Sequence, residues 1–68
     1  MYKLPQRLKE LRIEKGLSFQ TLATEVKISH ASLCRWENAI SEPKGSQVIT
    51  LARFFNVSTD YLLGLKDF

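Results

Sequence analysis

The chain has 68 residues, of which 44% are hydrophobic and 25% are charged, and its net charge of +3 gives a pI of about 9.3. These values are typical of one small globular domain, here residues 1–68, and they favour a polyanionic partner. The single cysteine excludes an internal disulfide, and no apolar run reaches the roughly 20 residues of a membrane span. Because no signal peptide is recognisable, the expected location is the cytoplasm.

The first predicted helix begins near Pro5, because proline fits the first turn of a helix, where its missing N–H costs nothing. Leu4, Leu8 and Leu11 recur at helical spacing, and Gly16 supplies a left-handed stop. Residues 1–16 hold five basic side chains against two acidic ones, whereas the charges of residues 17–68 cancel. The positive excess is therefore expected on this first helix.

Two short helices are predicted next, over Phe19–Val26 and His30–Trp36, with the tripeptide Lys27-Ile28-Ser29 between them. Ser18 and Ser29 are good N-caps for the two helices. Each helix carries one apolar stripe, and Ile28 is placed beneath the turn. This pattern predicts a helix-turn-helix formed by the second and third helices.

A loop is expected over Ala39–Ser46, which contains a proline, a glycine and two serines. The apolar spacing from Val48 to Phe55 indicates a fourth helix, and Ser58 caps a short fifth helix that Gly64 closes. No stretch alternates long enough to predict a strand, so the expected fold is all-α with five short helices. The expected core consists of Leu8, Leu11, Leu17, Leu22, Val26, Ile28, Leu33, Trp36, Val48, Leu51, Phe55, Val57 and Leu62.

Several short segments, taken together, point to one protein family. They are Arg7–Arg12, Gly16–Ser18, Trp36-Glu37-Asn38, Glu42-Pro43, Asn56–Ser58 and Asp60–Gly64. With these segments the sequence resembles the Xre/Cro family, the five-helix, lambda-repressor-like DNA-binding domains of phage repressors and many bacterial regulators. The resemblance implies that the chain binds double-stranded DNA and that its third helix lies in the major groove.

Helical geometry independently selects the exposed face of the third helix. Because Leu33 and Trp36 point inward, four other positions of this helix must point outward. These candidate base-contacting residues are His30, Ala31, Cys34 and Arg35. Arg35 suits a bidentate contact with guanine O6 and N7, His30 suits a purine edge, and Ala31 suits a thymine methyl group.

The resemblance also implies contacts to DNA phosphates and one internal ion pair. The phosphate contacts are assigned to Ser18, Phe19, Ser29, Ser32, Asn38 and Lys44. Phe19 contributes only a backbone N–H, because the free N–H groups at the start of a helix attract anions. The ion pair joins Arg12 to Glu37 and would hold the first helix against the third.

The sequence departs from the family pattern at four places. Phe19 stands where glutamine is usual, and its side chain is expected neither to bond a phosphate nor to brace His30. Lys27 replaces a turn glycine, which costs about 1 kcal/mol if the backbone is left-handed there. The other departures are Ala39 and Ile40, in place of a glycine and a basic residue, and Gly45, in place of an apolar anchor.

Some of these side chains allow other interpretations. His30 and Cys34 have a spacing that can chelate a metal, but two ligands are too few for a stable site, so no metal or other cofactor is expected. An exposed Cys34 thiol near His30 is also compatible with redox sensing. Phe19 either packs against Trp36 or the first helix, or it is exposed with Ile40 and receives a protein partner.

Three classes of function can be compared on this basis. An enzyme is not expected, because the acidic residues are scattered and the chain is too short to enclose a cleft. The preferred function is a sequence-specific transcriptional regulator, in the form of a repressor, that binds a near-palindromic operator as a homodimer. The alternative is a protein-interaction module with weak or no DNA binding. Neither a membrane nor a small-molecule ligand is expected.

A dimer interface is predicted near the C-terminus. The apolar residues of that region exceed what so small a core can absorb, so part of them is expected to be covered by a second copy. These residues are Phe54, Tyr61, Leu65 and Phe68.

Overall fold

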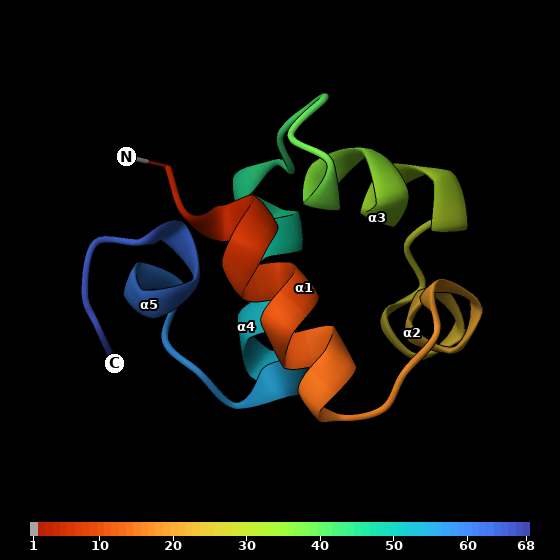
Figure 1. The fold of residues 1–68 in the computed structure, drawn as a ribbon, viewed down its shortest axis with the longest axis horizontal. Coiled ribbons are helices and arrows are strands. Elements are labelled where there is room, and N and C mark those ends of the chain that lie inside the picture. Colours follow the sequence, from red (N-terminus) through yellow and green to blue (C-terminus); the bar gives the residue numbers. More distant parts are fainter. Residues whose placement is uncertain (1) are drawn as a thin grey trace.

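The computed structural model describes residues 2–68 and consists of five α-helices joined by short connections (Figure 1). The helices are α1 (Leu4–Glu14), α2 (Phe19–Val26), α3 (His30–Glu37), α4 (Gly45–Phe55) and α5 (Thr59–Leu63). Residues 2–68 contain no strand, so the predicted all-α class with five helices is confirmed. None of these helices is long and apolar enough to cross a membrane.

The helices surround one core, with α1 in the middle of the view and α4 behind it (Figure 1). The α5 helix lies on one side of α1, and α2 and α3 lie on the other side. Contacts join α1 to α3 and α5, α2 to α3 and α4, and α4 to α5. The α3 helix therefore packs on one face against α1 and α2.

Three helices are directly preceded by a serine N-cap, as the sequence predicts. Ser18, Ser29 and Ser58 have extended backbones, and each Oγ accepts a hydrogen bond from the backbone N–H three residues later. The N···O distances are 3.1, 3.1 and 3.0 Å, respectively. Each cap satisfies one of the free N–H groups of the first turn and fixes where the chain enters the helix.

Two helix boundaries differ from the prediction. The predicted loop Ala39–Ser46 is wrong at its end, because α4 already begins at Gly45. The Lys44 N–H donates to Oε1 of Gln47 at 2.8 Å, and the last two residues of the predicted loop, Gly45 and Ser46, are therefore helical. The α3 helix also extends one residue further than predicted, to Glu37.

The core agrees with the predicted one at its centre and differs at its margin. Leu11, Leu17, Ile28 and Val57 are only partly buried and pack against the outside of the core. Leu4 and Ala52 are buried although they were absent from the prediction. The buried apolar residues are Leu4, Leu8, Leu22, Val26, Leu33, Trp36, Val48, Leu51, Ala52, Phe55 and Leu62.

Arg7 is buried beside this core, with only 9% of its surface exposed. Its Nη1 donates hydrogen bonds to the backbone carbonyls of Tyr61 and Lys66, the latter at 2.6 Å. Its guanidinium carbon also lies 4.2 Å from the centroid of the Tyr61 ring. Arg7 thereby joins α1 to the C-terminal segment, and these bonds satisfy its buried charge.

Candidate nucleic-acid interface

The face of α3 that points away from the core is open. Leu33 and Trp36 are buried, whereas His30, Ala31 and Arg35 are exposed. This is the outward orientation that helical spacing predicts for these three side chains. The fourth predicted residue, Cys34, is half-buried.

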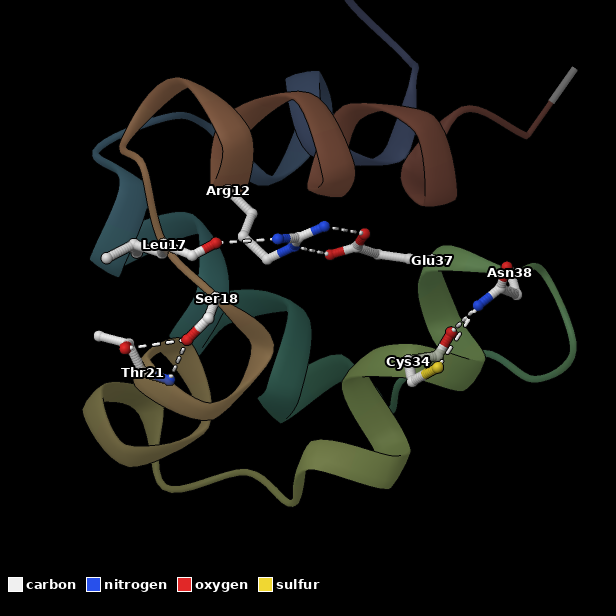
Figure 2. Close-up of polar contacts among 7 residues, drawn as sticks. All are labelled: Arg12, Leu17, Ser18, Thr21, Cys34, Glu37 and Asn38. Carbon is white, nitrogen blue, oxygen red and sulfur yellow. Dashed lines mark hydrogen bonds and ion pairs between the residues drawn. The ribbon is translucent and has the colours of Figure 1, made fainter.

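The Cys34 side chain is held at the end of its own helix. Nδ2 of Asn38 donates to the Cys34 carbonyl oxygen at 2.8 Å and lies 3.5 Å from Cys34 Sγ (Figure 2). The Asn38 amide is thus held against the last turn of α3. Hydrogen bonds from Asn38 therefore join two predicted DNA-contacting residues. Cys34 was assigned to a base contact and Asn38 to a phosphate contact.

The other residues assigned to phosphate lie at helix starts. Ser18 and Ser29 precede α2 and α3, and their hydroxyl groups also bond Thr21 Oγ1 at 3.0 Å and Ser32 Oγ at 2.9 Å. Ser18, Ser29 and Lys44 are exposed, and Phe19 and Ser32 are half-buried. The free N–H groups and the dipoles of α2 and α3 give these two helix starts a positive potential.

An ion pair fixes α1 to the end of α3. Arg12 Nε and Nη2 donate to the two carboxylate oxygens of Glu37 at 2.7 and 3.2 Å, and Arg12 Nη1 donates to the Leu17 carbonyl at 2.8 Å (Figure 2). The Glu37 side chain is only 3% exposed and that of Arg12 is 14% exposed. This is the pair that the family resemblance implied. Its bidentate geometry fixes both side chains.

The Phe19 ring makes two contacts, and the one with His30 was not expected from the sequence. Its ring centroid lies 5.4 Å from that of His30 at an interplanar angle of 69°, an edge-to-face contact. The Arg12 guanidinium carbon lies 4.2 Å from the centroid of the same ring. Phe19 was not expected to brace His30, but the structure brings the two rings into contact through an aromatic edge, without a hydrogen-bonding group. Phe19 packs against the first helix, which was one of the two alternatives for this residue.

Lys9 borders the same surface and was missed in the sequence analysis. It is exposed, and together with Arg12, Phe19, Glu37 and Asn38 it lines a depression of about 190 Å³. Lys9 precedes Arg12 by three residues and so shares its face of α1. The excess of positive charge in residues 1–16 indicated a basic side chain in this region. The charge count alone, however, does not say which of these side chains faces α3.

The residues predicted for a dimer interface lie in α4, α5 and the C-terminal segment. Leu65 and Phe68 are 73% and 86% exposed. Phe54 is half-buried and in edge contact with Phe55, and Tyr61 is half-buried beside Arg7. Of the four, Tyr61 and Phe68 line one depression of about 550 Å³.

Known proteins resemble this chain in sequence and in fold. The helix-turn-helix family model (HTH_3) matches residues 8–62. The chain is 37% identical over 62 residues to an uncharacterized HTH-type transcriptional regulator, YobD of Bacillus subtilis, a match that covers 91% of this chain and 55% of YobD. It is 38% identical over 64 residues to the HTH-type transcriptional regulator ImmR of Bacillus subtilis, with 94% and 50% covered. The chain spans about half the length of these two regulators.

A solved structure supports the same assignment. The P22 c2 repressor, crystallised in complex with a synthetic operator, superposes with a TM-score of 0.83 at 27% identity, over 88% of this chain and 91% of the repressor. The family and the relatives are regulators and not enzymes. The chain belongs to the Xre/Cro-like helix-turn-helix family, the DNA-binding domains of transcriptional regulators.

Proposed function

We propose that this chain binds double-stranded DNA in a sequence-dependent way, with α3 in the major groove. The observation that carries the proposal is the open face of α3, where His30, Ala31 and Arg35 are exposed on the side opposite Leu33 and Trp36. A helix fits the major groove, where each base pair presents a distinct pattern of donors and acceptors. The similarity to a repressor that was crystallised with an operator supports this use of the face.

Each exposed side chain on α3 suits a different feature of a base edge. Arg35 offers two parallel donors for guanine O6 and N7, a contact worth about 1–3 kcal/mol of discrimination. His30 offers a ring nitrogen to a purine edge, and Ala31 offers a methyl group to thymine. Cys34 is half-buried and bonded by Asn38, so its contribution is a van der Waals contact at the edge of this face.

Phosphate contacts hold α3 in the groove. We assign them to Ser18, Ser29, Ser32, Asn38 and Lys44, to the backbone N–H of Phe19, and to Lys9. Lys9 adds a cation beside Asn38 in the depression between α1 and α3. Because the net charge is only +3, this binding should weaken moderately as the salt concentration rises.

A homodimer on a near-palindromic operator fits this interface. Two copies would place their α3 helices about 34–36 Å apart, one turn of the DNA. The exposed Leu65 and Phe68, with Phe54 and Tyr61, are the residues that we assign to contacts between copies. We assign this chain to a repressor that acts on DNA in the cytoplasm, and the similarity to the P22 c2 repressor supports this assignment.

Fluorescence anisotropy with labelled duplexes tests the proposal. The chain is titrated into a pool of mixed sequence and into single duplexes, each at about 50 and 200 mM salt. The expected result is an affinity that differs between duplexes and falls with salt. Equal and very weak binding to every duplex would contradict the proposal and would favour a protein-interaction module. Ile40, which is 70% exposed, would then be the first residue to test for partner contact.

A further inference from the structure

We propose that Phe19 is a positioning residue that sets the base preference of His30. This inference rests on the proposed function, because it concerns how one side chain of the α3 face is oriented toward DNA. The two aromatic rings meet edge to face with their centroids 5.4 Å apart. This separation lies within the range at which aromatic pairs attract each other beyond simple burial.

The backbones beneath the two rings are fixed. Phe19 is the first residue of α2 and His30 is the first residue of α3. Each follows a serine whose Oγ accepts a backbone hydrogen bond at 3.1 Å, so the start of each helix is held by its cap. The relative position of the two Cα atoms is therefore set by the fold, and only side-chain torsions remain free.

The Phe19 ring is fixed in turn by Arg12. The guanidinium carbon lies 4.2 Å from the ring centroid, within the range of a cation–π contact. Arg12 cannot rotate freely, because it donates three hydrogen bonds, two to Glu37 and one to the Leu17 carbonyl. The side chains form a series from the buried Glu37, through Arg12 and Phe19, to the exposed His30.

His30 depends on this contact for its orientation. Among residues 2–68, no hydrogen bond involves the His30 ring. Its two nitrogens are thus left for a base edge, while the Phe19 contact restricts the rotation of the imidazole. A side chain that is already oriented loses less rotational freedom on binding, an effect worth about 3- to 10-fold in affinity. This gain applies only to the base pair that the oriented ring fits.

Two substitutions at Phe19 test whether its ring orients His30 or only fills the space next to Arg12. Phe19→Leu keeps an apolar side chain next to Arg12 but removes the aromatic edge, whereas Phe19→Tyr keeps the ring. Competition binding is measured against duplexes that differ at one base pair each. We expect Phe19→Leu to lower the preference about 3- to 10-fold at one position only, the position at which His30→Ala also lowers it. Phe19→Tyr should retain the preference.

A double variant completes the test. In the His30→Ala chain, Phe19→Leu should cause no further loss at that position, because the ring that it orients is absent. The inference is overturned if Phe19→Leu leaves the preference profile unchanged, if it weakens all duplexes equally, or if its effect persists in the His30→Ala chain. If the unaltered chain shows no preference at any base pair, the proposed function fails, and this inference fails with it.

A measurement without DNA tests the geometry itself. In the free chain, NMR should show nuclear Overhauser effects between the Phe19 ring protons and the His30 ring protons. The His30 proton shifts should also move in Phe19→Leu, because the ring current of Phe19 is lost. Absence of the Overhauser effects in the folded, unaltered chain would overturn the inference even if Phe19→Leu did not fold.

Discussion

Arg12 Nε lies 2.7 Å from Glu37 Oε2, and this ion pair joins the first helix to the last residue of α3. The Glu37 carboxylate is almost fully buried, so its charge is satisfied mainly by Arg12. The same guanidinium bonds the Leu17 carbonyl, directly before the cap of α2. One side chain therefore sets the position of both helices of the helix-turn-helix relative to α1 (Figure 2).

Removal of Arg12 should destabilise the fold. Arg12→Ala leaves the Glu37 carboxylate buried without a partner, a change that costs about 3 kcal/mol. The free energy of unfolding from urea titration measures the loss. Arg53→Ala is the matched control, because it removes an exposed arginine of α4 and should change stability by less than about 0.5 kcal/mol. Equal effects of the two substitutions would contradict the structural role of the pair.

Lys27 should be replaceable by glycine with a gain in stability. Its backbone is left-handed, with φ 57° and ψ 40°, a conformation that is strained for lysine. Lys27→Gly should raise the free energy of unfolding by about 0.5–1 kcal/mol. Asn56 has nearly the same backbone angles, but asparagine tolerates them better, so Asn56→Gly should gain less. A larger gain at Asn56 than at Lys27 in thermal unfolding would refute this explanation.

Arg7 should hold the C-terminal segment in place. Arg7→Ala leaves the carbonyls of Tyr61 and Lys66 without these charged donors and should cost about 2 kcal/mol. Hydrogen exchange should quicken most at the amides of α5 and of residues 64–66. Gln6→Ala, an exposed change on the same helix, is the control and should leave these rates unaltered. If amide hydrogen exchange became faster to the same extent in all helices, Arg7 would have no local role in the C-terminal segment.

Tyr2 should make the stability of the fold depend on pH in the alkaline range. Burial raises the pKa of the Tyr2 phenol above its usual value of 10.0, and the negative charge of Glu42 raises it further. The unfolded chain therefore ionises first, and the folded chain loses stability as the pH rises above that value. Urea unfolding is measured at about pH 9 and about pH 11 for both chains. The free energy of unfolding of Tyr2→Phe should increase relative to that of the unaltered chain between these two pH values. The same difference at both pH values would count against the shift.

The sequence predicts the fold well where the signals are local. Serine caps, apolar spacing and left-handed stops act within one or two turns, and so the starts of α2, α3 and α5 agree with the structure. The predicted start of α4 was wrong because its N-cap position holds Lys44, which is not one of the usual N-cap residues, although Gln47 at the third helical position accepts a hydrogen bond from the Lys44 N–H.

The sequence predicts the site less completely, because its support comes from distant contacts. The burial of Arg7 depends on carbonyl groups that lie 54 and 59 residues away, and nothing near Arg7 indicates them. The contact between Phe19 and His30 was missed for a different reason. Phenylalanine lacks the polar group of the usual glutamine, and its edge contact with His30 is seen only when both rings are placed.

Selection of bound sequences from a random duplex library tests the central claim, that the open face of α3 recognises DNA. The selection is made with the unaltered chain, with Arg35→Ala and with Arg53→Ala, which removes the same charge on another helix. The unaltered chain and Arg53→Ala should select the same site, and Arg35→Ala should lose about 10-fold or more in preference at one base pair of each half-site. Selection of no common sequence by the unaltered chain, or of an identical site by Arg35→Ala, would contradict the claim.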